Sequence, residues 1–144
     1  MVSPDCRIFK EAYPLGCYQQ YTISAMGWIV VFHDAFDAEF SVFSPDVQTV
    51  LLSKAKLLEV FGPQLGRPHV DTLNGSKHAN MKELRFDAAD GVWRVAFAFD
   101  MLRQAVILVA GDKSGGSEKR FYRTLIATAD QRFDDHLAQQ EEGS

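Results

Sequence analysis

Most of the side chains that could act on a phosphate group lie in the middle of the sequence. Between Arg67 and Arg123, ten Lys or Arg residues stand against seven Asp or Glu residues, so this segment carries a net charge of +3. The other residues carry −7, and the formal charge of the whole chain is −4. Phosphate binding needs clustered Lys and Arg. The charges therefore argue against a broad nucleic-acid-binding surface, while the middle segment could form a local site.

Side chains of these types could act on a phosphodiester without a metal. If the substrate were RNA, its 2′-hydroxyl would be the nucleophile, and the protein would supply a base for its proton, cations for the charge developing on the phosphoryl group and an acid for the leaving oxygen. Arg94 is the strongest candidate for a cation, because strand alternation groups it with the small residues Ala96 and Ala98 around a shallow concavity. The alternative is an Arg94 that pairs with Glu83 or Asp112 to stabilise the sheet.

The strand before Arg94 carries two further cations. Alternation places Arg85 with Glu83 on one face, and Lys82 with Leu84 on the other. Arg85 is therefore the better neighbour for Arg94. For Lys82, a solvated face of the hairpin is the favoured interpretation.

Other kinds of site have little support in the sequence. The four histidines are far apart and have no Cys partner or ligand spacing, so neither a metal nor a cofactor is predicted: His33, His69, His78 and His136. His69 and His78 could act as an acid or a base near neutral pH. There is no nucleophile elbow, and residues 111–116 lack a phosphate-loop pattern.

The first half of the predicted domain contains one strand and a helical hairpin. The run Trp28–Phe32 is aromatic and β-branched, which is typical of a strand. Apolar residues then recur every three or four positions up to Phe61, with an interruption at Ser44 and Pro45 that is typical of a helix start. Gly62 and the proline after it end the second helix. A polar connection, residues 64–80, follows.

The second half is predicted to contain three strands and a helix. Residues 82–86 and 92–99 alternate on either side of a turn rich in Asp and Gly, and residues 104–110 are suited to the middle of a covered sheet. After Ser117, apolar residues recur at every fourth position and predict a helix that packs on the sheet or on a partner: Phe121, Leu125, Ala129, Phe133 and Leu137. The predicted class is α+β with one core.

The domain is expected to span residues 26–140, with an N-terminal extension at 1–25 and a short tail at 141–144. The extension shows neither helical nor strand periodicity, although Tyr13, Tyr18 and Tyr21 could anchor it. Cys6 and Cys17 both lie in this extension and cannot staple the core. No apolar run reaches the length of a membrane helix or a signal peptide, so a cytoplasmic protein is expected.

Five short motifs, taken in order, resemble the phage-derived, HigB-like subgroup of the RelE/ParE toxin superfamily. They are Phe61-Gly-Pro-Gln-Leu-Gly-Arg-Pro68, Asp71-Thr-Leu-Asn-Gly-Ser76, Asn80-Met-Lys-Glu-Leu-Arg85, Val92-Trp-Arg-Val-Ala-Phe97 and Ala110-Gly-Asp-Lys113. The resemblance covers Trp28 to about Leu137. It implies a RelE-like fold, in which a helical hairpin packs on a small, mostly antiparallel sheet and a C-terminal helix follows.

The resemblance also implies a function and partners. Such proteins are toxins of type II toxin-antitoxin systems, and each is neutralised by a cognate antitoxin, here expected to be a small helix-turn-helix protein. Many members cleave mRNA on the ribosome without a metal. Others inhibit DNA gyrase, and some are inactive binding modules. A ribosome-dependent mRNA endonuclease is the leading hypothesis, with gyrase inhibition or a non-catalytic binding module as the alternatives.

The resemblance suggests roles for individual residues. An arginine at the position of Arg94 lies in the active centre of family members, and basic residues occur where Lys113 stands. Tyr122 follows at a place where the family often has a functional Tyr or His, so it could act as a base or stack on a nucleotide, with core packing as the alternative. Glu83 departs from the family, which often has lysines on this strand. Further RNA contacts are predicted at Lys82, Lys119, Arg120, Arg67, Lys77 and His78.

Overall fold

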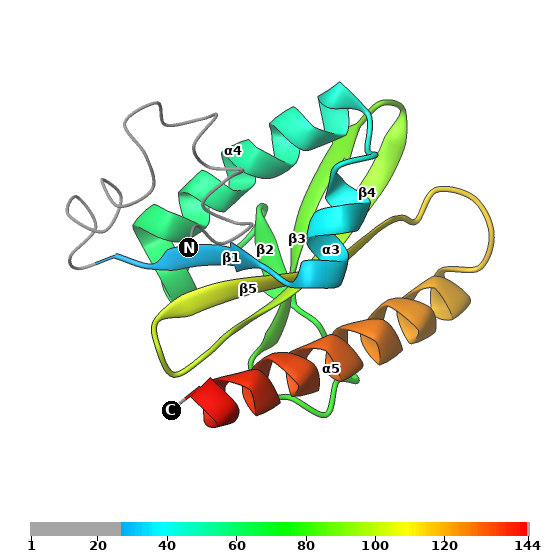
Figure 1. The fold of residues 1–144 in the computed structure, drawn as a ribbon. Helices are drawn as coiled ribbons and strands as arrows, with labels where there is room; N and C mark the ends of the chain where they lie inside the picture. Colours follow the sequence, from blue (N-terminus) through cyan, green and yellow to red (C-terminus); the bar gives the residue numbers. More distant parts are fainter. Residues whose placement is uncertain (1–26, 144) are drawn as a thin grey trace.

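A five-stranded sheet lies between two layers of helices in the computed structural model, which describes residues 27–143 (Figure 1). The sheet order is β1-β5-β4-β3-β2, where β1 runs parallel to β5 and the other neighbours are antiparallel. The helices α3 and α4 cover one face, and α5 covers the other. The strands are β1 (Ile29–Phe32), β2 (Val70–Thr72), β3 (Met81–Ala88), β4 (Gly91–Phe99) and β5 (Gln104–Asp112). The helices are α3 (Asp34–Phe40), α4 (Pro45–Phe61), the short 3₁₀ helix η1 (Gly62–Gln64) and α5 (Glu118–Gly143).

The helical hairpin forms where the sequence predicts it. The Ser44 side chain caps α4 by accepting a hydrogen bond from the Val47 amide at 3.4 Å, and Pro45 occupies the first turn. The helix ends at Gly62, which has a φ of +54°. A Cβ atom at Gly62 would lie 2.3 Å from the Trp28 ring, so this position requires glycine for space as well as for conformation.

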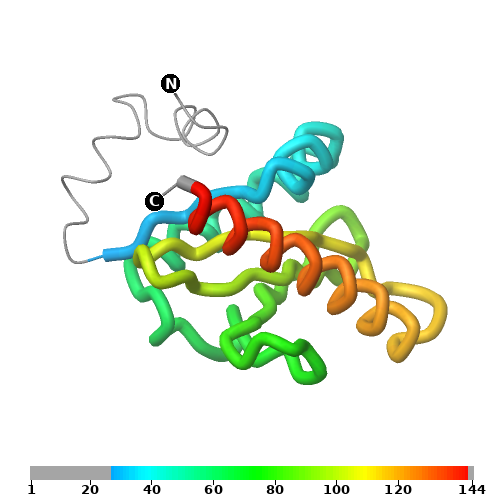
Figure 2. The backbone as a smooth tube through the Cα atoms, turned by 60° about the horizontal axis from the view of Figure 1, so that its bottom comes forward, coloured from blue at the N-terminus to red at the C-terminus, as the bar shows by residue number. Residues whose placement is uncertain are grey.

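Strand alternation divides the core into two layers. The large side chains of β4 point towards α3 and α4, whereas Ala96 and Ala98 point towards α5. Because these alanines are small, α5 can lie close to the sheet, and Figure 2 shows it crossing β4 and β5. The buried stripe of α5 is the predicted one: Leu125, Ala129 and Phe133. The choice left open by the sequence is thus resolved, since this stripe packs on the sheet.

The structure departs from the sequence-based expectation at a few points. The polar connection contains a short edge strand, β2, which pairs with β3 around Val70 and Leu84. A β-bulge interrupts the pairing of β4 with β5 between Ala96 and Phe97. Helix α5 continues to Gly143, through most of the expected tail. The expected extension, residues 1–25, lies outside the described residues. Among residues 27–143, no helix is long and apolar enough to cross a membrane.

The far end of α5 is attached to the sheet through a buried carboxylate. Asp100 is fully buried in the turn between β4 and β5, where it accepts hydrogen bonds from the Leu102 and Gln104 amides at 2.9 and 3.0 Å. It also accepts from His136 Nε2 at 2.9 Å and Gln140 Nε2 at 2.6 Å, both on α5. Burial alone would raise the pKa of Asp100, but these hydrogen bonds outweigh burial and lower it.

We therefore expect Asp100→Ala to lower the free energy of unfolding by roughly 3 kcal/mol, because several buried donors lose their acceptor. Urea denaturation followed by circular dichroism measures this loss. Asp87→Ala, an exposed aspartate on β3, is the matched control and should change the value by less than about 0.5 kcal/mol. Equal effects of the two substitutions would contradict the anchoring role.

The lowered pKa of Asp100 predicts that the stability of the fold depends on pH. Because its folded pKa lies below its unfolded value, Asp100 stabilises the fold above about pH 4, and this contribution disappears as the pH falls through the folded pKa. The stability difference between the wild type and Asp100→Asn should therefore shrink between about pH 5 and pH 2. A stability difference that stays constant over this range would show that the ionised form of Asp100 does not stabilise the fold.

Candidate functional site

Polar side chains come together where the first turns of α5 meet the sheet. The strand register places Arg94 on β4 directly opposite Arg85 on β3 and Gly111 on β5. Glu83 precedes Arg85 by two residues and so lies on the same face. Tyr122, from the first turns of α5, contacts both Glu83 and Arg94. Three of the predicted site residues, Arg94, Arg85 and Tyr122, are thus neighbours in space.

Arg94 is buried in an unusual setting for a guanidinium group. It is only 6% exposed, and its Nη1 donates to the carbonyl oxygen of Trp93 at 2.8 Å. Its Nε has no hydrogen-bond partner among residues 27–143. Leaving a buried donor unpaired costs free energy. An anion that enters from the α5 side would supply the missing acceptor, and a phosphate oxygen has the right chemistry.

Glu83 is the residue that sequence reasoning did not assign to the site. It is 5% exposed, and its Oε1 also lacks a hydrogen-bond partner in the part of the chain that the structure describes. Burial raises the pKa of Glu83, and this effect outweighs the hydrogen bond with Tyr122 and the positive charge of Arg94. A carboxylate with a raised pKa is suited to accept a proton near neutral pH. The signal was present in the sequence, because alternation places Glu83 on the face of Arg85.

Tyr122 is held in its protonated form. Its pKa is raised by burial, by the negative charge of Glu83 and by the hydrogen bond with that carboxylate. A phenol with a raised pKa is a poor base at neutral pH but can donate a hydrogen bond or a proton. The geometry therefore favours Tyr122 as a donor over its predicted role as a base.

Lys113 lies at the edge of this group, just after β5. Its Nζ is 5.8 Å from the centre of the Tyr122 ring and 2.5 Å from Oε1 of Glu118. The hydrogen bond that Lys113 donates to Glu118, together with its positive charge, lowers the pKa of that exposed carboxyl. Lys113 thus joins the strand end to the start of α5 beside the candidate site.

The remaining predicted RNA contacts divide into two groups. Lys119 and Arg120 are exposed in the first turn of α5, next to the site. Lys77 and His78 instead contact Asp134, with His78 Nε2 at 2.9 Å from the carboxylate. Asp134 lies twelve residues beyond Tyr122, or roughly 18 Å along the helix, so this pair is separate from the site.

Arg67 and Lys82 are also positioned away from the buried group. Arg67 is largely exposed and pairs with Asp71 at 2.8 Å, while Asp71 also lies 3.2 Å from Arg85. Lys82 shares its face of β3 with Leu84, which packs under α4, so it points away from Arg94. The structure therefore places Arg67 at the rim and Lys82 on the opposite side of the sheet.

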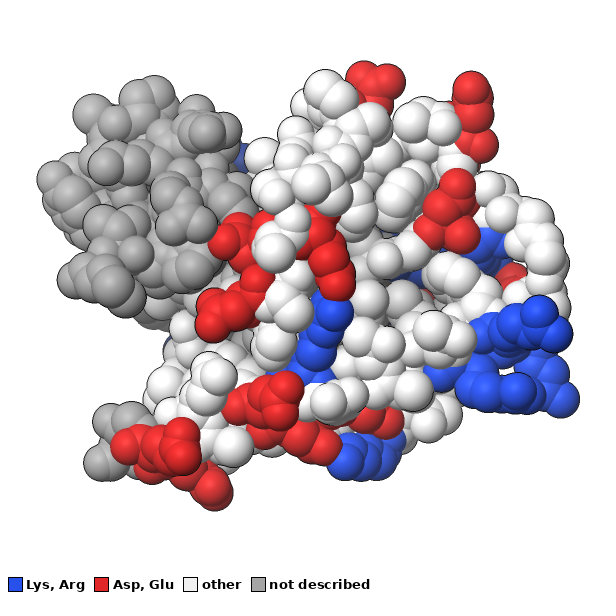
Figure 3. Space-filling model, turned by 45° about the vertical axis from the view of Figure 1, so that its right-hand side comes forward, with Lys and Arg blue, Asp and Glu red and all other residues white. Residues whose placement is uncertain are grey.

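The charges on α5 are the reverse of those that stabilise a helix. Lys119, Arg120 and Arg123 lie in the first two turns, whereas Glu141 and Glu142 lie in the last turn. The helix dipole favours anions at the N-terminus and cations at the C-terminus. Figure 3 shows Lys and Arg gathered where α5 begins. Glu118, the acid of the first turn, pairs with Lys113. This end of the helix is therefore electropositive on balance, and an anionic ligand would relieve the repulsion.

Within residues 27–143, no three His, Cys, Asp or Glu side chains are grouped so that they could hold a metal ion. The polar groups at the site are instead two arginines, one lysine, one tyrosine and one buried carboxylate. A family model described as "Phage derived protein Gp49-like (DUF891)" matches residues 38–134, which include all of these groups. The chain belongs to the Gp49-like family.

Two similar proteins come from Mycobacterium tuberculosis. "Putative toxin HigB3" is 44% identical to this Gp49-like chain over 104 residues, which cover 72% of the chain and 89% of the relative. "Putative toxin HigB2" is 45% identical over 94 residues, which cover 65% of the chain but only 46% of that protein. No solved structure matches the chain. The HigB-like relationship predicted from the motifs is confirmed.

Replacing Glu83 with Gln tests whether the buried, ionised carboxylate destabilises the fold. The pKa of Glu83 is higher in the folded state than in the unfolded state, so ionisation of this side chain lowers the free energy of unfolding. The loss grows as the pH rises from the unfolded-state pKa to the folded-state pKa. The stability of Glu83→Gln relative to the wild type should therefore increase between about pH 4 and pH 8, by roughly 1–3 kcal/mol. Urea denaturation at several pH values measures it. A decrease over this range would mean that Glu83 is a stabilising partner of Arg94.

Proposed function

We propose that this Gp49-like chain is the toxin of a type II toxin-antitoxin system and that it cleaves mRNA on the ribosome without a metal. The buried group of Arg94, Glu83 and Tyr122, with its two unpaired polar atoms, carries the proposal. The names of the two M. tuberculosis relatives support the toxin role. We also propose that the fold is RelE-like.

Each step of the reaction has a suitable residue at this site. Glu83 accepts the proton of the 2′-hydroxyl, and the 2′-oxygen attacks the adjacent phosphorus atom. Arg94 and Arg85 stabilise the negative charge on the phosphoryl oxygens. Tyr122 donates a proton to the 5′-oxygen as its bond to phosphorus breaks. The products are an RNA end with a 2′,3′-cyclic phosphate and an end with a 5′-hydroxyl.

The start of α5 must move for RNA to reach these residues, because Arg94 and Glu83 are only 6% and 5% exposed. The loop before the helix contains Gly115 and Gly116, both with positive φ. The buried stripe begins only at Leu125, and Phe121 and Tyr122 before it are partly buried, so the first turns of α5 are less firmly packed than the middle of the helix. Engagement with the ribosome and mRNA would provide the energy to open this end.

A cognate antitoxin is part of the proposal. A small helix-turn-helix protein that covers the electropositive start of α5 would neutralise Lys119 and Arg120 and block access to Arg94. The gene next to this one should encode such a protein. Co-purification of the two chains from cells that express both genes is a direct test of the pairing.

Inhibition of a protein target such as DNA gyrase is the second candidate, and a binding module without catalysis is a weaker third. The observation that favours gyrase inhibition is the formal charge of −4, which is unusual for a protein that must bind RNA. Gyrase supercoiling assays with purified protein distinguish the alternatives. Inhibition of supercoiling, with transcripts left intact in the cell, would favour the second candidate.

Expression of the full chain without an antitoxin should arrest growth and leave cleaved transcripts. Arg94→Ala should reduce cleavage by roughly 100-fold or more, because it removes the forked donor from the phosphate, and Arg94→Lys should restore only part of it. Lys82→Ala, on the opposite face of the same sheet, is the matched control and should remain toxic. Colony counts and primer extension measure both effects. Arrest with intact mRNA would contradict the nuclease assignment.

The exposed cations at the start of α5, Lys119 and Arg120, should contribute to RNA binding through their charge alone. Lys119→Ala with Arg120→Ala should weaken ribosome binding and reduce the slope of log affinity against log salt by about 2, one for each lost phosphate contact. Lys56→Ala, an exposed lysine of α4, is the control. Sedimentation with ribosomes at several salt concentrations gives the slopes. Unchanged slopes would place the RNA contacts elsewhere.

A further inference from the structure

A second surface stands apart from the basic site. Large apolar side chains are exposed at the end of α4 and in the turn between β4 and β5. Val60 is 63% exposed, Phe61 50%, Met101 96% and Leu102 64%. We call these four residues, together with Trp28, the apolar end. Clustered exposure of this kind usually marks a surface that is covered in the functional protein.

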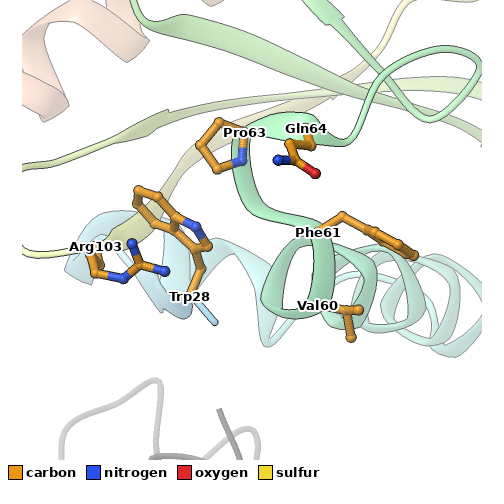
Figure 4. A pocket seen from close by; sticks show the side chains of 6 residues that line it. All are labelled: Trp28, Val60, Phe61, Pro63, Gln64 and Arg103. Carbon is orange, nitrogen blue, oxygen red and sulfur yellow. The ribbon is translucent and has the colours of Figure 1, made fainter. Parts of the chain in front are cut away.

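A hollow of about 400 Å³ opens in the apolar end. Its lining residues are Trp28, Val60, Phe61, Pro63, Gln64 and Arg103. The Arg103 guanidinium lies 4.7 Å from the centre of the Trp28 ring, while Val60 and Phe61 project from the last turn of α4 (Figure 4). The hollow thus presents two aromatic rings, aliphatic side chains and a single positive charge.

This end of the molecule is distant from the candidate RNA site. Figure 1 shows the last turn of α4 and the β4–β5 turn at one end of the sheet and the first turn of α5 at the other. The seventeen residues of α4 alone span roughly 25 Å. An occupant of the hollow would therefore not cover the start of α5.

We propose that the apolar end is the docking surface for residues 12–26 of the same chain. The first described residue, Gly27, is already at the hollow, because its carbonyl oxygen accepts a hydrogen bond from Arg103 Nη2 at 3.0 Å. Trp28, the next residue, forms a wall of the hollow. The chain before Gly27 therefore leaves the domain directly beside the exposed apolar side chains.

The composition of this segment matches the surface. Residues 12–26 contain no Asp, Glu, Lys or Arg, in a chain that is 24% charged. They include three of the four tyrosines of the chain, Tyr13, Tyr18 and Tyr21, besides Leu15 and Ile23. Tyrosine buries a large apolar ring while its hydroxyl stays at the surface, which suits a half-open hollow. A tyrosine ring can also stack on the exposed side of Arg103.

The segment is long enough to cover the whole surface. Fifteen extended residues reach roughly 50 Å, about twice the length of α4. Attachment at Gly27 makes docking intramolecular, so even weak contacts keep the segment in place at any protein concentration. A second copy of the chain would need to bury the same surface without this advantage.

Chymotrypsin cleavage of the full chain tests the proposal. Docking protects the bonds after Tyr18 and Tyr21, since cleavage follows the fraction of time that the segment is detached. The double substitution Phe61→Asp with Leu102→Asp should therefore speed this cleavage by about tenfold. Both positions are exposed, so the fold itself should remain intact. Val42→Asp is the matched control, because Val42 is 82% exposed but lies between α3 and α4, outside the apolar end.

A converse experiment uses the segment itself. Tyr13→Ser, Tyr18→Ser and Tyr21→Ser together should uncover the apolar end and at least double the fluorescence of 1-anilinonaphthalene-8-sulfonate, with an unchanged thermal melt. Substituting Gln19, Gln20 and Thr22 by Ser is the control in the same segment. Equal cleavage of the wild type and the double variant would overturn the proposal. The proposal would also be overturned if the mass of the wild type doubled with rising concentration while the segment stayed accessible to chymotrypsin. A second copy of the chain would then cover the surface. Neither readout depends on RNA cleavage.

Discussion

The burial of Arg94 and Glu83 between the sheet and α5 is the constraint on which the rest of the structure depends. Removing charged groups from water is costly, and the cost is highest when their hydrogen-bonding atoms remain unpaired, as Nε of Arg94 and Oε1 of Glu83 do. The protein offsets this cost elsewhere, through the apolar stripe of α5 and the fully buried Asp100 at its far end. The two halves of α5 thus have different physical roles, because one stabilises the fold and the other closes over a destabilising polar group.

The small residues of the sheet make this arrangement possible. Ala96 and Ala98 allow α5 to approach β4, and at Gly111 a Cβ atom would lie 2.8 Å from the Phe121 ring. Larger side chains at these positions would lift the start of α5 and expose Arg94 to water. The same face therefore combines close helix packing at one end with two buried polar side chains, Arg94 and Glu83, beside the start of α5. The cations in the first two turns of α5 fit the proposed anionic ligand, since cations at the start of a helix weaken it.

Much of the fold could be predicted from the sequence because its signals are local. The cap at Ser44 and the helix end at Gly62 are set by short-range geometry, and strand alternation correctly separated Arg94 from the large side chains of β4. The short strand β2 was not predicted, because three residues of an edge strand leave no periodic pattern. The site was predicted only in part. The proximity of Tyr122 to Glu83 depends on how α5 crosses the sheet, and the attachment of Lys77 to Asp134 depends on the path of a loop, which no local pattern encodes.

The central claim is that the buried group under the start of α5 cleaves RNA through the 2′-hydroxyl. The most direct measurement is mass spectrometry of the RNA ends that the purified full chain produces on mRNA-programmed ribosomes. The account predicts a 2′,3′-cyclic phosphate on one fragment and a 5′-hydroxyl on the other, with Arg94→Ala yielding roughly 100-fold less of both. Intact mRNA, or ends with a 3′-hydroxyl and a 5′-phosphate, would contradict it, because the latter require water rather than the 2′-hydroxyl as the nucleophile.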